Sequence, residues 1–379
     1  MKREQEIVLL LVGSALWNRP IEALPDDVDW VRVYELAVKQ TVTGLLADSL
    51  KLLPEGVMPP DAVLQRLRHF RINSIRTHAL LNSRLADVLA ILKTKGIDPV
   101  LFKGQGLALN YPDPTARQCG DIDLYVGKDY DAACAAAYDS FGAQDHDSES
   151  IKHMHLSYKG VEVELHKIAE SIPGISKDRK YQEWTLKHLY GDQIRKVTIE
   201  SSEVQLPPYQ FDCIYVLNHL WHHFITGGVG LRQVCDWTVY LHAFHDKIDV
   251  NTLERDLRDF GLLKVWKIFA YIAVNQLGLP AEECPLYEDS ERRRAGKVLC
   301  RIFEEGNFGR HSEHKATPRP KGYAAGKLHS FYYNTSRYLR LIGVVPDFAF
   351  RYYTHYLISG IYHYFKGLRL DIQRSRSRV

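Results

Sequence analysis

The 379-residue sequence lacks an uninterrupted apolar segment of about 18 residues, the length that a membrane-spanning helix needs. The aromatic stretch 348–365 comes closest, but Arg351, His355 and His363 interrupt it. The segment 1–17 has only a short apolar run, is interrupted by two glutamates near its start, and is followed by no small-residue cleavage pattern. We therefore expect an amphipathic first helix there, not a signal peptide.

The sequence also lacks a Cys-x-x-Cys pair, because its six cysteines are widely scattered. We interpret them as reduced thiols of a cytoplasmic protein. The motifs of P-loop nucleotide-binding proteins, zinc proteases with HExxH and hydrolases with GxSxG are absent as well. Net charge is only +3, so charge alone does not favour nucleic-acid binding. A hydrophobic content of 45% is enough for a globular core.

The hydrophobic pattern divides the chain into three regions. Residues 1–95 have apolar residues at helical spacing, whereas 96–206 contain short runs with the period of strands. Residues 207–379 return to helical spacing and end in a basic tail. The helices expected in this last region lie at 211–224, 231–244, 253–277 and 328–367. We predict an α+β fold, in which a small mixed sheet is flanked by N- and C-terminal helical regions.

Strands are expected in the middle region at residues 99–102, 121–126, 153–158 and 161–166. Short helices are expected between them at 104–111 and 129–141. The two strands around Lys159-Gly160 should form a hairpin, and a further hairpin is expected at residues 196–206.

Two of the predicted strands have an acidic face. Asp121 and Asp123 alternate with aliphatic residues, so both carboxylates project from one face, roughly 6–7 Å apart along the strand. Glu162 and Glu164 alternate in the same way. Neighbouring carboxylates repel each other unless a cation lies between them, and Mg²⁺ prefers such oxygen ligands. Either strand alone is typical of a half-exposed sheet, but the two together favour a metal site.

The segment KGQGLALNYPDPTARQCGDIDLYV, followed by VEVELH, resembles an uncharacterised bacterial nucleotidyltransferase family of the polymerase-beta-like nucleotidyltransferase superfamily. The resemblance covers residues 99–166 closely. It implies Mg²⁺ and the transfer of a nucleoside monophosphate from ATP or another NTP to a hydroxyl group, with loss of pyrophosphate. It assigns catalysis and metal binding to Asp121, Asp123 and Glu164, with Glu162 as the second choice for the third carboxylate.

The same resemblance implies a nucleotide site. Gly104 permits close approach of the backbone to phosphate, and Lys103 supplies a positive charge. Gln105 stands where most of the superfamily has Ser or Gly. Arg117 precedes the acidic strand and would either hold phosphate or cap the turn. A looser match through LNHLWHHF and GLRQVCDW adds to the nucleotide or acceptor site His223, Arg232 and Asp236.

Several alternatives remain open. The departure at Gln105 leaves open a catalytically silent nucleotide-binding or regulatory protein with the same fold. Arg232 and Asp236 stand four residues apart and could instead form an ion pair within one helix. The acceptor could be a small molecule or a macromolecule, and the near-neutral charge does not favour a nucleic acid.

The histidines also allow more than one interpretation. His219, His222 and His223 have helical spacing that could bind zinc, but no further ligand set accompanies them. A structural or substrate-pocket role is therefore favoured for these three. His153 and His155 alternate along a strand and are expected on the protein surface.

Overall fold

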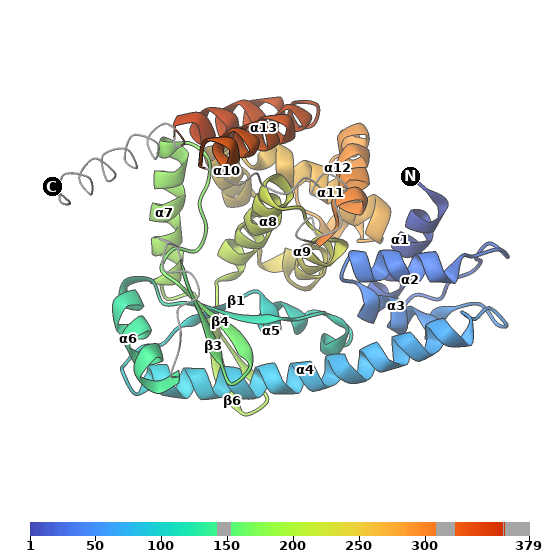
Figure 1. Ribbon diagram of the computed structural model, residues 1–379, viewed down its shortest axis with the longest axis horizontal. Coiled ribbons are helices and arrows are strands. Elements are labelled where there is room, and N and C mark those ends of the chain that lie inside the picture. The colour runs from blue at the N-terminus through green and yellow to red at the C-terminus, as the bar shows by residue number, and fades with distance from the viewer. Residues whose placement is uncertain (142–152, 308–322, 359, 361–379) are drawn as a thin grey trace.

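The computed structural model describes the chain except for residues 142–152, 308–322, 359 and 361–379. The predicted basic tail lies outside the described residues. Figure 1 shows a sheet between the long helix α4 (Asp61–Lys93), which runs below it in that view, and a group of C-terminal helices above it. The predicted mixed sheet with flanking helical regions is confirmed.

The N-terminal region is helical, as its apolar spacing predicts. Before α4 it contains α1 (Arg3–Trp17), α2 (Trp30–Lys39) and α3 (Thr43–Ser49). In the middle region, the helices are α5 (Gly104–Ala108), α6 (Tyr130–Phe141) and α7 (Ile175–Leu189). The C-terminal helices are α8 (Tyr209–Thr226), α9 (Leu231–Phe244), α10 (Val250–Phe260), α11 (Leu263–Leu277), α12 (Arg292–Glu305) and α13 (Tyr323–Ile342), and residues 346–358 are also helical.

The described strands form one six-stranded sheet in the order β3-β4-β2-β1-β6-β5. Its strands are β1 (Val100–Phe102), β2 (Asp121–Tyr125), β3 (His153–Tyr158), β4 (Val161–His166), β5 (Arg195–Ile199) and β6 (Ser202–Leu206). The two predicted hairpins, β3–β4 and β5–β6, are confirmed as antiparallel pairs. Strands β2 and β4 run parallel, as do β1 and β6, so the sheet is mixed.

Two of the predicted C-terminal helices are wrong in extent. The helix expected at 253–277 is broken at Gly261, whose φ of +72° ends α10 in a left-handed conformation. The helix expected at 328–367 begins earlier, at Tyr323, and α13 ends at Ile342. A new helical segment begins at Pro346, a residue that is favoured at the first turn because it has no N–H to donate.

One face of the sheet packs against α4 and α6. Ile122 of β2 and Val163 of β4 are fully buried there, in a cluster that includes Leu85 of α4 and Ala137 of α6. This is the apolar side of the alternating pattern that marks both strands in the sequence.

The opposite face is directed toward α8. Phe102 of β1 packs on this side against Tyr215 of α8, with ring centroids 4.5 Å apart. In the strand register, Asp123 lies opposite both Phe102 and Glu164. Because register partners project from the same face of a sheet, the carboxylates of Asp123 and Glu164 are directed toward the C-terminal helices.

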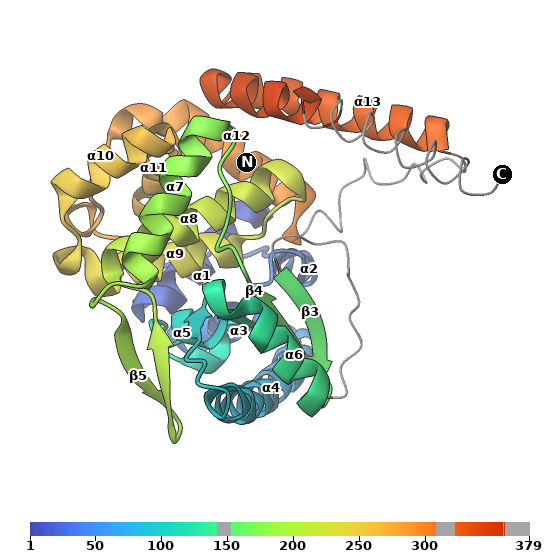
Figure 2. The same cartoon turned by 90° about the vertical axis from the view of Figure 1, so that its left-hand side faces the viewer.

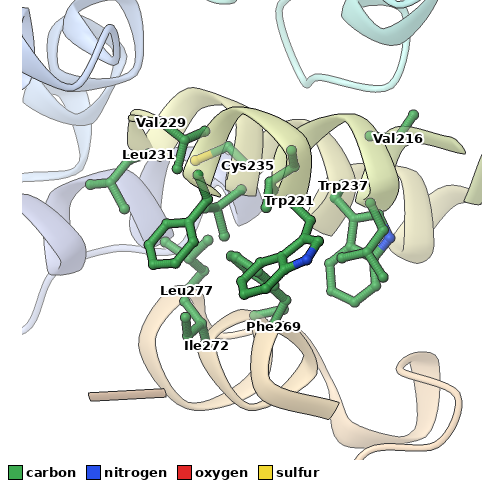
Figure 3. Close-up of a cluster of buried hydrophobic side chains, with 14 of the residues drawn as sticks. Val216, Trp221, Val229, Leu231, Cys235, Trp237, Phe269, Ile272 and Leu277 are labelled. Atoms are coloured by element: carbon green, nitrogen blue, oxygen red, sulfur yellow. The ribbon is translucent and has the colours of Figure 1, made fainter. Parts of the chain in front are cut away.

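A large aromatic core fixes the helices on that side (Figure 3). Trp221 of α8 and Phe269 of α11 pack edge to face, and both are almost completely buried. Trp237 of α9 meets Trp266 of α11 in the same manner, with ring centroids 4.8 Å apart. The same hydrophobic cluster includes residues of α1 and of β1, so it contains members of all three regions that the sequence pattern distinguishes. In the described part of the chain, no helix combines the length and apolarity needed to cross a membrane.

The backbone of helix α3 packs directly against the backbone of the segment before β2. A Cβ atom added at Gly44 would lie 2.1 Å from the carbonyl oxygen of Ala116, far inside van der Waals contact. Only glycine therefore allows α3 to pack against the turn Pro114–Ala116, which leads into the acidic strand.

We expect Gly44→Ala to lower the free energy of unfolding by about 1–3 kcal/mol, because two backbone segments must move apart. Gly296→Ala in α12 is the matched control, since nothing lies within 4 Å of its added Cβ. Alanine is the better helix former there, so the control should be neutral or stabilising. Chemical denaturation of both variants measures this, and equal effects would contradict the close packing of α3.

Candidate active site

A pocket of about 290 Å³ lies between the acidic face of the sheet and helices α8 and α9. It brings together residues that are far apart in the sequence. Nine of the ten predicted site residues line it: Lys103, Gly104, Arg117, Asp121, Asp123, Glu164, His223, Arg232 and Asp236.

The carboxylate of Asp123 is the most enclosed charge in the pocket, with a relative exposure of 2%. Its Oδ1 atom lies 3.0 Å from Lys103 Nζ and accepts a hydrogen bond of 2.9 Å from His166 Nε2. His166 Nε2 is also 3.3 Å from Oε2 of Glu164. One imidazole therefore links the carboxylates of two adjacent strands.

The strand register decides which glutamate stands beside Asp123. Glu164 is its direct partner across the parallel β2–β4 pair, whereas Glu162 lies opposite Asp121. Glu162 is exposed and does not line the pocket. Of the two glutamates left open by the sequence, the geometry thus favours Glu164.

Oxygen and nitrogen donors from Asp123, Glu164 and His166 lie within 4.8 Å of one another. Asp121 lines the same pocket but is not part of this close group. His166, the last residue of the VEVELH segment, is thus a site residue that the sequence assignment missed. Its alternation with Glu162 and Glu164 on one face was the available signal.

The pKa values of the two aspartates are shifted in opposite directions by their neighbours. Burial would raise the pKa of Asp123, but the Lys103 ammonium and His166 outweigh it and lower that pKa well below its usual range. The negative charge of Asp123, together with burial, raises the pKa of Asp121. Burial would lower the pKa of His166, but its hydrogen bonds to Asp123 and Glu164 raise it. These shifts favour an ionised Asp123 and a protonated His166.

Lys103 reaches Asp123 from an unusual backbone conformation. Its φ of +51° and ψ of −132° are rare for a residue with a side chain, and Gly104 also has a positive φ, of +39°. The pair forms the sharp turn from β1 into α5. Burial opposes a charged lysine, yet Asp123, Asp121 and Glu164 raise the pKa of Lys103, which therefore stays protonated.

Arg117 and Asp236 form a buried ion pair between the segment before β2 and helix α9. Arg117 donates through Nε and one terminal nitrogen to the two carboxylate oxygens of Asp236, at 2.7 and 2.8 Å. Tyr111 donates a further hydrogen bond of 2.6 Å to Asp236. The guanidinium of Arg117 thus binds both carboxylate oxygens of Asp236. Arg117 acts as a clamp that joins the segment before β2 to α9.

The sequence left open an ion pair between Arg232 and Asp236 within helix α9. The structure does not form this pair, because Asp236 is bonded to Arg117 and Tyr111 instead. Arg232 instead donates to the carbonyl oxygen of Gln118, at 2.5 Å. Its Nε atom is buried and has no hydrogen-bond partner among the described residues.

A family model described as an uncharacterised nucleotidyltransferase matches residues 26–278, which include the whole pocket-forming sheet. The chain belongs to this nucleotidyltransferase family. No curated protein sequence matches the chain. The crystal structure of an antigenic nucleotidyltransferase-like protein from Paracoccidioides brasiliensis is similar over 52% of this chain and 92% of that one, at 15% identity and a TM-score of 0.33.

In this member of the family, Gln105 is the predicted site residue that does not line the pocket. It is 2% exposed, and neither atom of its amide has a hydrogen-bond partner among the described residues. Helix α5 is packed between α4 and α9, which explains why its second residue is enclosed. A direct contact of Gln105 with a nucleotide has no support in this geometry.

The histidines are placed differently from the sequence expectation. His153 and His155 are half-buried and line the pocket, so the face expected on the protein surface is the face directed into the pocket. The reason is the β3–β4 register, which puts His155 opposite Glu164 and His153 opposite His166. The register with the neighbouring strand determines which face of a hairpin is directed inward. Alternation of residues along one strand does not reveal that register.

The histidines of α8 form the opposite wall of the pocket, together with Glu170. His219 Nδ1 and His222 Nδ1 lie 3.7 and 3.8 Å from the two oxygens of Glu170. His219 Nε2 is also 3.5 Å from Lys103 Nζ. Burial and the Lys103 charge lower the pKa of His219 to about 4, so its imidazole is neutral at physiological pH.

The Arg117–Asp236 pair leads to a stability prediction. Asp236→Asn removes the negative charge and leaves the guanidinium of Arg117 buried without a counter-ion. We expect the free energy of unfolding to fall by about 3–5 kcal/mol. Asp246→Asn is the control, because Asp246 is exposed and forms an ion pair with the adjacent, exposed Lys247. The stability of this variant should be unchanged. Similar denaturation midpoints for the two variants would contradict the role of Arg117 as a clamp.

Proposed function

We propose that the chain is an active nucleotidyltransferase that moves a nucleoside monophosphate from an NTP, with ATP as the expected donor, to a hydroxyl group of an acceptor. Membership of the family supports a nucleotidyl-transfer role. The observation that carries the proposal is the direct pairing of Asp123 with Glu164, in one pocket with Lys103 and Arg232.

The donor chemistry of this pocket fits Mg²⁺. Asp121, Asp123 and Glu164 offer carboxylate oxygens, which are the ligands that Mg²⁺ prefers. In the proposed enzyme these three residues would hold the metal, which when bound would supply positive charge against the triphosphate and the attacking hydroxyl. His166 orients two of the carboxylates through its contacts with Asp123 and Glu164.

Cationic side chains on either side of the acidic strand suit the triphosphate. Lys103 places its ammonium at the end of β1, and Gly104 beside it forms the turn that a bulkier residue would strain. Arg232 enters the pocket from α9, and one of its terminal nitrogens donates to the carbonyl oxygen of Gln118, so the rest of its guanidinium edge that lines the pocket can donate to a phosphate oxygen. Arg117 and Asp236 act as positioning residues, because each already binds the other.

The acceptor hydroxyl needs a group that takes its proton. Asp121 has no ion pair or hydrogen bond among the described residues, unlike Asp123 and Glu164. One of its two carboxylate oxygens would bind the metal, and the other is available to take the proton. The wall formed by His219, His223 and Glu170 lies across the pocket and offers polar groups for the rest of the acceptor.

One observation favours a second candidate, a catalytically silent nucleotide-binding or regulatory protein. Lys103 and His166 both contact Asp123 and compensate its charge. A silent protein of this kind would bind an NTP with an affinity that does not depend on Mg²⁺. Calorimetric titration of ATP with and without Mg²⁺ separates the two candidates, since the transferase requires tighter binding when Mg²⁺ is present.

Carboxylate variants test the transferase directly. Purified protein is incubated with α-labelled ATP, Mg²⁺ and acceptor panels of sugars, amino-sugars, proteins and RNA, and both label transfer and pyrophosphate release are measured. We expect Asp123→Asn and Glu164→Gln to lower the rate by about a hundredfold or more, because each removes a charge needed in the transition state.

Glu162→Gln is the matched control, on the same strand but outside the pocket, and should retain the activity. Full activity of Asp123→Asn would refute the mechanism. Equal losses in Glu162→Gln and Glu164→Gln would show that the strand register does not select the catalytic glutamate.

Arg232 provides an independent prediction for nucleotide binding. Arg232→Gln removes a charge-assisted donor to phosphate, so calorimetry should show ATP affinity weakened by about tenfold to a hundredfold. Arg76→Gln, at an exposed position of α4, should leave the affinity unchanged. The assignment fails if Arg232→Gln binds ATP as tightly as the unaltered protein does.

A further inference from the structure

A second group of donor atoms lies beside the carboxylate pair, on strand β3. This strand forms one edge of the sheet (Figure 2). Its antiparallel register with β4 places His155 opposite Glu164 and His153 opposite His166. Both imidazoles therefore project from the same face as the acidic residues, and both line the pocket.

The donor atoms in this group are close enough to share one ion. His155 Nδ1 is 3.2 Å from Glu164 Oε1, and the rings of His153 and His155 have centroids 4.5 Å apart. One donor atom from each of these three residues lies within 4.8 Å of the other two. Tetrahedral zinc, with ligand distances of about 2.0–2.1 Å, needs donor separations of roughly 3.4 Å, so small side-chain rotations suffice.

Glu164 stands between two donor groups of different chemistry. Its Oε1 atom faces His155, while its Oε2 atom lies 3.3 Å from His166, which is bonded to Asp123. The side toward Asp123 is rich in carboxylate oxygen, and the side toward β3 is rich in imidazole nitrogen. Imidazole ligands suit Zn²⁺ and similar transition-metal ions, whereas Mg²⁺ selects oxygen.

We propose that His153, His155 and Glu164 form a second metal site that takes Zn²⁺ or another divalent ion with affinity for imidazole. Three protein ligands leave a coordination position open to water or to a polar group of a molecule in the pocket. The ion also ties the edge strand β3 to the glutamate that pairs with Asp123. The site does not depend on transferase activity.

The histidines of α8 are the competing location for such an ion. Among the described residues, His219, His222 and Glu170 do not form a group with donor atoms as close together as those on β3 and β4. Their imidazole-to-carboxylate distances are 3.7 and 3.8 Å, compared with 3.2 Å for His155 and Glu164. The geometry therefore points to the β3 edge.

Cobalt(II) is a suitable probe, because its visible absorption bands report coordination by protein ligands. Tag-free protein freed of metal by a chelator is titrated with Co²⁺. We expect saturable bands that Zn²⁺ abolishes and that excess Mg²⁺ leaves in place. The double variant His153→Gln/His155→Gln should bind Co²⁺ about a hundredfold more weakly or worse, since it lacks two direct ligands. His69→Gln, an exposed histidine of α4, is the control.

X-ray absorption of the zinc-loaded, unaltered protein gives a readout without any substitution, and we expect two imidazole ligands. The proposal is overturned if the protein shows no saturable Co²⁺ bands, if the β3 double variant binds as tightly as the control, or if His219→Gln/His222→Gln abolishes binding instead. Each of these outcomes is independent of nucleotide transfer, so failure of the metal site and failure of the transferase are distinguishable.

Discussion

The buried negative charge of Asp123 is the constraint on which the geometry of the pocket depends. A carboxylate that is 2% exposed is costly unless cationic or hydrogen-bonding groups compensate it. Lys103 reaches it from the end of β1, and His166 reaches it from β4. Both are adjacent because β2 lies between these two strands in the sheet. The positive φ of Lys103 is part of the same arrangement, since that turn carries its ammonium to the carboxylate.

A second buried charge pair holds the two walls of the pocket together. Arg117, on the segment before β2, is bonded to Asp236 on α9, and the aromatic core fixes α9 against α11. The close approach of Gly44 to Ala116 holds the same segment from the N-terminal side. Elements from all three regions of the sequence thus determine where the acidic strand meets the helices. The N-terminal helices, although far from the acidic strand in sequence, therefore contact the segment that leads into it.

Local patterns in the sequence were sufficient for much of the fold and for part of the site. Alternation of charged and aliphatic residues located both acidic strands, and with them Asp121, Asp123, Glu162 and Glu164. The family resemblance then selected Glu164 over Glu162. The lysine–glycine turn before α5 placed Lys103 in the same pocket. The prediction of the acidic strands is correct because the two-residue period of a strand determines which side chains share a face. Even the break at Gly261 had a local signal, a glycine within a helical pattern.

Contacts between residues that are far apart in the sequence could not be predicted from local patterns. The partner of Asp236 is Arg117, more than a hundred residues away, and not the nearer Arg232. His153 and His155 enter the pocket because of strand register, which alternation along β3 alone leaves undetermined. Gln105 shares its short helix with pocket-lining residues, yet tertiary packing encloses it.

In the proposed enzyme, Asp123 and Glu164 share one nucleotide site with Lys103 and Arg232. Diffraction from crystals grown with Mn²⁺ and a non-hydrolysable ATP analogue tests it most directly, because Mn²⁺ replaces Mg²⁺ and gives an anomalous signal. We predict an anomalous peak at the carboxylates of Asp123 and Glu164, with the triphosphate contacting Lys103 and Arg232. Nucleotide bound elsewhere, or an empty pocket at saturating analogue, would contradict the proposed nucleotide site.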